Sequence, residues 1–148
     1  MNIILLFLAA TAVLVDCSSS PRYTADPGTK TKGAVALSSV GAVEYGVSSY
    51  YADDFHGKLT ANGEVYDMYG MTAAHNTLPL NTIIRVTNLE NKKVIILRIN
   101  DRGPFVKNRI LDCSYGAALK LGFIGKGTAR VKIEVIELGN NQYWKKKD

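Results

Sequence analysis

Residues 83–101 read IIRVTNLENKKVIILRIND and carry the clearest β-strand pattern in the chain. Two runs rich in β-branched residues, 83–88 and 94–99, lie on either side of the polar segment 90–92. The length and polarity of that segment suit a hairpin turn. We therefore expect two antiparallel strands here. Asp101 follows the second run directly, where Gly103 and Pro104 turn the backbone.

The sequence around this hairpin also favours short strands. Residues 129–135 alternate apolar and charged side chains, which is typical of a strand with one face in solvent. Ser114 can cap a short helix through Leu121, and Gly122 can end it in the left-handed conformation. Such elements within residues 43–139 predict a mostly β domain, closed into a small barrel with one or two short helices, because closure removes exposed strand edges.

The N-terminus has the pattern of an export signal. Residues 3–15 are a continuous apolar stretch, short for a membrane span but suited to a signal-peptide core. Residues 14–17, LVDC, are similar to a bacterial lipobox, so we expect a lipoprotein signal peptide over 1–16 and lipidation of Cys17. Secretion with a free cysteine and an uncleaved anchor are the alternatives. Ser18 after the cysteine mildly favours the outer membrane over the inner one, with the protein facing the periplasm.

The composition of the two flanking segments differs from that of the barrel region. Residues 17–42 are mainly Ser, Thr, Gly, Ala, Lys and Pro, which bury too little surface to offset chain entropy, so we expect a flexible tether. Residues 140–148 contain the run Lys145 to Lys147, and we expect a basic tail. The two boundaries leave 43–139 as the folded domain.

Charge and cysteine content exclude some functions. A net charge of +5 favours an anionic neighbourhood, but no helix carries a basic stripe with interleaved aromatic residues, so we expect no nucleic-acid partner. Cys17 and Cys113 form no cluster with metal-ligand spacing, and we expect no metal and no organic cofactor. Cys113 is predicted to be a small buried side chain.

Three segments have the character of a site: FHGKLTANGE at 55–64, MTAAH at 71–75 and NDRGPF at 100–105. Together they resemble the rare lipoprotein A family, over about residues 45–138. The resemblance implies a six-stranded double-psi β-barrel, similar to that of expansins. It also implies lytic transglycosylation of peptidoglycan glycan strands, with a preference for strands that lack stem peptides. The product carries a 1,6-anhydro-N-acetylmuramic acid end.

The resemblance further implies roles for three residues: Asp101 as the general acid and base, with Glu64 and His75 assisting. Taken without the family, each has an ordinary structural interpretation. Asp101 can accept hydrogen bonds in a turn or pair with Arg102. Glu64 after the turn can simply be solvated, and His75 can be a structural residue of a strand.

A second group is expected to bind the sugar strand: Tyr51, Phe55, His56, Asn62, Arg102 and Arg109. Aromatic rings can stack on sugar faces but are more often core residues in a small barrel. Arginines can pair with the lactyl carboxylates of muramic acid or with a structural partner such as Asp112. The main rival hypothesis is a module that binds glycan without cleaving it. A third is a structural envelope lipoprotein. We expect a monomer.

Overall fold

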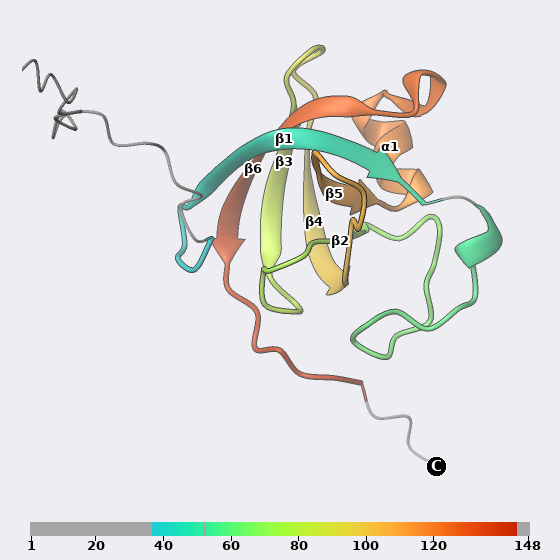
Figure 1. The fold of residues 1–148 in the computed structure, drawn as a ribbon, viewed down its shortest axis with the longest axis vertical. Helices are drawn as coiled ribbons and strands as arrows, with labels where there is room; N and C mark the ends of the chain where they lie inside the picture. The colour runs from blue at the N-terminus through green and yellow to red at the C-terminus, as the bar shows by residue number, and fades with distance from the viewer. Residues whose placement is uncertain (1–36, 52, 145–148) are drawn as a thin grey trace, which may run out of the picture. The chain divides into compact units, whose positions relative to one another are not determined.

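The computed structural model describes residues 37–51 and 53–144, which fold into a closed barrel of six strands (Figure 1). The strands are β1 (Val43–Tyr50), β2 (Thr72–Ala74), β3 (Ile83–Asn88), β4 (Val94–Asp101), β5 (Arg109–Cys113) and β6 (Ala129–Glu137). One helix, α1 (Tyr115–Leu121), and two 3-10 turns, η1 (Asp53–Phe55) and η2 (Ile124–Lys126), complete the described elements. The expected mostly β, six-stranded barrel is confirmed. The signal peptide over 1–16, Cys17 and the tether up to residue 36 lie outside the described residues.

The order of the strands around the barrel is β1-β5-β2-β4-β3-β6, with β6 closing on β1. β1 pairs with β5 and β2 with β4 in parallel, and the other pairs are antiparallel. The predicted hairpin is β3 and β4, with Ile84 opposite Leu97. The three-residue β2 lies between β4 and β5, and its last residue, Ala74, pairs with Asp101 on one side and Asp112 on the other.

The interior of the barrel is filled by side chains from alternate strand positions. Ile84, Leu97, Ile99, Val131 and Ile133 are at most 1% exposed. The predicted helix α1 is also confirmed. The Ser114 side chain accepts from the Ala117 N–H at its start, and Gly122 ends it at φ 76°.

Two segments outside the expected domain 43–139, the end of the predicted tether and the start of the predicted basic tail, pack on the barrel. Leu37 and Ala42 are buried, and the Gly41 N–H donates to Val135 O at 2.8 Å. The packed part of the chain therefore begins before Val43. The segment before Val43 is rich in small residues, but the apolar side chain of Leu37 is buried in the core. At the other end, Trp144 N donates to Asn62 O at 2.7 Å, so residues 140–144 are docked. The lysines after Trp144 lie outside the described residues.

Cys113 is fully buried and carries a free thiol. Burial raises the pKa of this thiol to about 12. Within residues 37–51 and 53–144, no helix is long and apolar enough to cross a membrane. In the same part of the chain, no three or more His, Cys, Asp or Glu side chains are grouped so that they could hold a metal ion.

Candidate active site

A groove of about 490 Å³ opens at the end of β4 and along the neighbouring β5, where Arg109 and Asp112 line it. Asp101 lies opposite Ala74 on one side of β2, and Asp112 lies opposite the same residue on the other side. With strands spaced about 4.8 Å apart, the two Cα atoms are on the order of 10 Å from each other. Tyr51, directly after β1, lines the groove beside them. This register brings two carboxylates from separate strands into one concave site.

Asp101 is held by three donors. Its Oδ1 accepts the main-chain N–H groups of Ala61 and Arg102, both at 2.8 Å. Its Oδ2 accepts the Tyr51 hydroxyl at 2.9 Å. Oδ1 is therefore fully used, whereas Oδ2 keeps a lone pair on which an exchangeable proton can be carried.

Tyr51 was expected to contact sugar, but its hydroxyl is committed to Asp101. Burial raises the pKa of this phenol, and the neighbouring charge of Asp101 raises it further. The phenol therefore keeps its proton and acts as a hydrogen-bond donor. Its ring also contacts Phe55 and Tyr66, with centroids 5.5 Å and 5.2 Å away, which fixes its orientation.

Asp112 is a second groove carboxylate that the sequence left as a local structural acceptor. The Ser49 hydroxyl donates to its Oδ1, and Arg109 Nε lies 3.8 Å from the same oxygen. Arg109 Nη1 also donates to Ser49 Oγ at 2.8 Å. Asp112 is thus an ion-paired carboxylate beside Asp101. Little in the sequence indicates that Asp112 lies in the groove, because only the pairing of β2 with both β4 and β5 places it beside Asp101.

The walls of the groove are apolar and cationic. Phe55 and Phe105 are 45% and 88% exposed, which leaves ring surface open to a ligand. Lys58 Nζ lies 5.0 Å from the centre of the Phe55 ring. Phe105 and Lys58 were not among the expected binding residues, although both stand within the quoted motifs. Rings beside positive charge suit a sugar chain that carries carboxylates.

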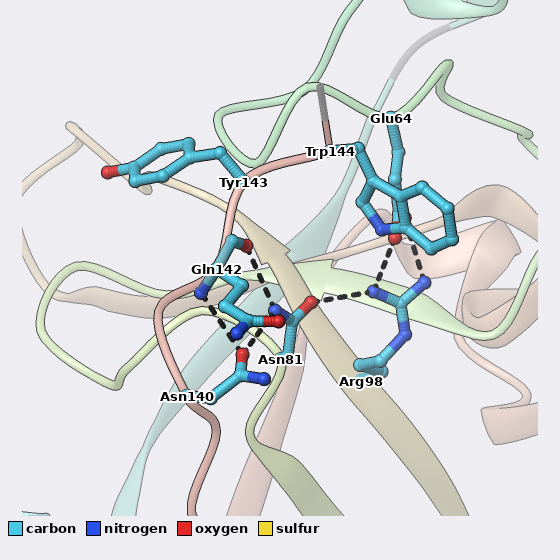
Figure 2. A pocket seen from close by; sticks show the side chains of 7 residues that line it. All are labelled: Glu64, Asn81, Arg98, Asn140, Gln142, Tyr143 and Trp144. Carbon is cyan, nitrogen blue, oxygen red and sulfur yellow. Dashed lines mark hydrogen bonds and ion pairs between the residues drawn. The ribbon is translucent and has the colours of Figure 1, made fainter. Parts of the chain in front are cut away.

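Glu64 does not line this groove, contrary to the expectation that it faces the same site as Asp101. It lines a separate cavity with Arg98 and Trp144 (Figure 2). The two guanidinium nitrogens Nη1 and Nη2 of Arg98 donate to its two oxygens at 2.7 and 2.8 Å, and Asn100 Nδ2 donates at 3.1 Å. Burial raises the pKa of Glu64, but the hydrogen bonds from Arg98 and Asn100 and the Arg98 charge outweigh it, so the pKa is lowered. Glu64 is therefore ionised at neutral pH and is a poor proton donor.

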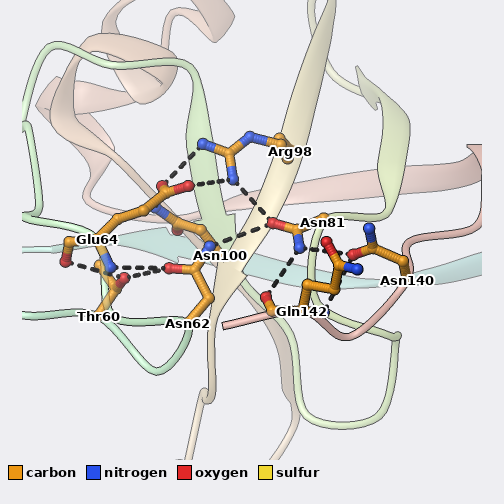
Figure 3. Close-up of polar contacts among 8 residues, drawn as sticks. All are labelled: Thr60, Asn62, Glu64, Asn81, Arg98, Asn100, Asn140 and Gln142. Atoms are coloured by element: carbon orange, nitrogen blue, oxygen red, sulfur yellow. Dashed lines mark hydrogen bonds and ion pairs between the residues drawn. The ribbon is translucent and has the colours of Figure 1, made fainter. Parts of the chain in front are cut away.

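The turn 60–64, whose internal contacts Figure 3 shows, contacts both sites: the Ala61 N–H donates to Asp101 in the groove, and Glu64 lines the other cavity. Asn62, expected to bind substrate, is fully buried inside it. Its Oδ1 accepts from the Thr60 hydroxyl at 2.7 Å and from the Glu64 N–H at 3.2 Å. Asn62 thus shapes the turn. The same turn presents the Ala61 N–H to Asp101. Glu64 does not line the groove and can affect Asp101 only by stabilising this turn.

His75 is buried, and both ring nitrogens are used within the protein. Nδ1 accepts the N–H groups of Thr77 and Leu78 at 3.2 and 3.0 Å, so the proton resides on Nε2, which faces Glu44 at 3.1 Å. The His75 carbonyl accepts from Arg102, at 3.1 Å. His75 therefore supports the chain next to Asp101 and is not among the residues that line the groove.

The other two expected binding residues differ in position. Arg102 lines the groove, but its Nη1 donates to the carbonyls of His75 and Leu78, which holds it along the wall. His56 is exposed, its Nδ1 accepts the Met68 N–H at 3.1 Å, and it lies outside the groove lining.

Residues 43–133 match the family model described as "Lytic transglycolase". The chain is 60% identical over 92 residues to "Endolytic peptidoglycan transglycosylase RlpA" of Pseudomonas aeruginosa (strain UCBPP-PA14), covering 62% of this chain and 27% of that protein. It is 45% identical over 133 residues to the protein of the same name from Campylobacter jejuni, covering 85% and 48%. The chain thus spans between about a quarter and a half of these relatives.

A solved structure of a Clavibacter michiganensis expansin, a point mutant in complex with cellohexaose, shares the fold. The TM-score is 0.53 at 13% identity, and the match covers 65% of this chain and 51% of that one.

Proposed function

The chain belongs to the lytic transglycolase family, and on that premise we propose that its Asp101 groove cleaves the glycan strands of peptidoglycan by endolytic transglycosylation. One observation carries the proposal: Asp101 is a groove carboxylate whose Oδ2 keeps a lone pair for proton exchange, whereas Glu64 is ionised and paired outside the groove. The name of the relatives, endolytic peptidoglycan transglycosylase, supports the choice of substrate.

In the first step, Asp101 donates a proton to the glycosidic oxygen as that oxygen leaves C1 of N-acetylmuramic acid. The proton is carried on Oδ2, because Oδ1 already accepts two main-chain N–H groups. These donors and the Tyr51 hydroxyl fix the carboxyl group in position, so little reorganisation is needed when its charge appears.

In the second step, the Asp101 carboxylate accepts the proton of the C6 hydroxyl of the same sugar as that oxygen bonds to C1. The 1,6-anhydro ring closes, Asp101 regains its proton and no water is consumed. One carboxyl group therefore serves both steps.

Hydrolysis would instead need a second carboxylate to activate water. Glu64 lies outside the groove and is unsuited to this role. Asp112 lies inside it but is paired with Arg109 and accepts from Ser49. This pairing supports a role in which Asp112 holds Arg109 in place, so that the Arg109 guanidinium can bind a carboxylate of the substrate.

Glu64 and His75 are assigned as positioning residues. Glu64 with Arg98 stabilises the turn that presents the Ala61 N–H to Asp101. His75 holds the chain at Thr77 and Leu78 and, through its carbonyl, Arg102. Phe55 and Phe105 are assigned to stacking on sugar rings, since both are exposed on the groove wall.

The test is mass spectrometry of the products from purified glycan strands, with and without stem peptides, incubated with the chain starting at Ser18. Anhydro-muramyl ends, formed faster on stripped strands, are expected. Reducing ends would indicate hydrolysis and would make Asp112 the candidate for the second carboxylate that activates water. Binding without either product would favour the rival proposal of a non-catalytic glycan-binding lipoprotein.

We also propose that Cys17 carries a lipid anchor that holds a monomeric protein at the periplasmic face of a membrane, with the outer membrane preferred. A diacylglycerol group adds tens of methylenes at about 0.8 kcal/mol each, so the wild-type protein should enter the detergent phase and Cys17→Ser should not. Equal partitioning of the two would remove the anchor from the proposal.

A further inference from the structure

The cavity that contains Glu64 has no role in the chemistry above, yet it is well formed. Its volume is about 510 Å³, within the usual range of small-ligand sites. Arg98, Glu64 and Asn81 line it together with four C-terminal residues, Asn140, Gln142, Tyr143 and Trp144, and Figure 2 shows Trp144 next to Glu64 and Arg98.

The C-terminal segment is fixed by hydrogen bonds along its whole described length. Gly139 N donates to Thr82 Oγ1 at 2.9 Å, and Leu80 N donates to Asn141 Oδ1 at 2.7 Å. Asn81 Nδ2 donates to Asn140 Oδ1 at 3.0 Å and to Gln142 O at 3.1 Å (Figure 3). This wall is therefore built into the fold.

Two glycines permit the close approach of this segment. A Cβ at Gly63 would lie 2.7 Å from Trp144 O, and φ there is +85°. A Cβ at Gly139 would lie 2.0 Å from Leu80 O. The segment could not take this path with larger residues at either position without a backbone shift.

Groups suited to a sugar are left unused in this cavity. The Trp144 side chain is 66% exposed although its main-chain N–H is anchored to Asn62. Within residues 37–51 and 53–144, the indole N–H of Trp144 and the side-chain amide of Gln142 have no hydrogen-bond partner, and both residues line the cavity. An aromatic face and free amide donors and acceptors that line one cavity are suited to a pyranose ring and its acetamido group.

The charged residues that line the cavity restrict the kind of ligand it can bind. Among the described residues that line the cavity, Arg98 and Glu64 are the charged ones, and they pair with each other. A ligand carboxylate or phosphate would have to compete with Glu64 for Arg98, at the cost of leaving Glu64 unpaired. A neutral ligand avoids this cost.

We propose that this cavity is a second glycan-binding site that holds a neutral N-acetylated sugar, stacked on Trp144 and hydrogen-bonded by Gln142. The identity of its ligand rests on the proposed function, because peptidoglycan strands supply N-acetylglucosamine at every second position. The site lies across the 60–64 turn from Asp101, so it grips glycan outside the reacting bond.

Trp144 is the single tryptophan of the chain, and so its fluorescence reports on this cavity alone. The full chain in detergent is titrated with N-acetylchitotetraose, a neutral probe without muramic acid. A saturable change in Trp144 emission is expected, and Gln142→Ala should weaken the apparent affinity by about threefold to tenfold through the lost hydrogen bonds. No change at the solubility limit of the probe would overturn the proposal.

Three comparisons make the result specific. Tyr45→Ala removes a ring that is equally exposed but outside both cavities, and it should respond like the wild type. Phe105→Ala alters the groove and should also leave the Trp144 response intact. Loss of the response in Phe105→Ala would place the bound sugar in the groove and refute a second site. Cellotetraose, which lacks acetamido groups, should bind more weakly, and equal binding would refute acetamido recognition.

Failure of this inference and failure of the proposed function are distinguishable. Asp101→Asn should give the full Trp144 response although it forms anhydro ends at least about 10²-fold more slowly. A wild-type chain that makes anhydro ends without a Trp144 response would keep the enzyme and lose the second site. A Trp144 response without anhydro ends would support the glycan-binding site and contradict the proposed enzymatic activity.

Discussion

Asp101 and Glu64 are carboxylates on opposite sides of one five-residue turn, and their surroundings give them different chemistry. Asp101 accepts only neutral donors, from two main-chain groups and Tyr51. Glu64 is bound through both oxygens by a guanidinium and is held ionised, with its pKa lowered. A carboxylate in a family motif therefore takes its role from the charge of its partner.

Asp101→Asn should reduce activity more than any other single substitution. Asparagine keeps the size of the side chain but has no exchangeable proton, so the formation of anhydro ends should slow by about 10²-fold to 10⁴-fold. Retention on a glycan column should remain close to that of the wild type, and product mass spectrometry measures the rate. Full activity in this variant together with a dead Glu64→Gln would reverse the two assignments.

A smaller effect is expected for Tyr51→Phe, which removes one donor from Asp101 and leaves the ring contacts. Loss of a hydrogen bond to a charged group costs about 1.5 kcal/mol, or about tenfold in rate. Because burial and Asp101 raise the pKa of this phenol, the wild-type and Phe variants should show the same absorbance change on titration to pH 10. An extra tyrosine titrating below pH 10 in the wild type would contradict the raised pKa.

The fold could be predicted from the sequence where local signals agree. The alternation in β6, the hairpin of β3 and β4 and the capped helix α1 each follow from residues close in sequence. The strand order could not, because the parallel pairing of β2 with β4 depends on contacts between distant segments. The docking of residues 140–144 was missed for a similar reason. Polar tails are usually solvated, and only the partners Asn62, Leu80 and Asn81 fix this one.

The candidate site was predicted in part for the same reason. The position of Asp101 at a strand end follows from the sequence, whereas the partner of each carboxylate does not. Arg98 stands in the middle of an apolar strand run, and nothing local indicates that it pairs with Glu64 across 34 residues. Asp112 joins the groove only through the short strand β2.

The third prediction concerns Glu64→Gln, which leaves the half-buried Arg98 without its ion pair. We expect the free energy of unfolding to fall by about 1–2 kcal/mol, between the values for exposed and buried pairs. The rate should fall less than tenfold, because the turn loosens but Asp101 remains. Urea unfolding and the product assay measure the two effects.

Two further variants show whether Glu64 acts through Arg98. Adding Arg98→Gln to Glu64→Gln removes the unpaired charge and should restore part of both the stability and the rate, which a catalytic role of Glu64 would not allow. Glu90→Gln, in the exposed pair with Lys126, is the matched control and should change stability by less than about 1 kcal/mol. Absence of any rescue would argue for direct participation of Glu64.

The weakest effect is the pH dependence of this ion pair. Because the pKa of Glu64 is lowered in the folded chain, the unfolded chain binds more protons at this position in mild acid. The stabilisation is therefore fully present above the unfolded pKa, about 4.5, and is lost as pH falls through the folded pKa.

Other carboxylates titrate in the same range, so the useful quantity is the difference in unfolding free energy between the wild type and Glu64→Gln. Protonated glutamate and glutamine are both neutral and of similar size, so this difference should be largest between about pH 5 and pH 7 and shrink toward pH 3. A difference that stays constant across this range would mean that the stabilisation does not depend on the charge of Glu64, and the contrast with Asp101 would lose its electrostatic basis.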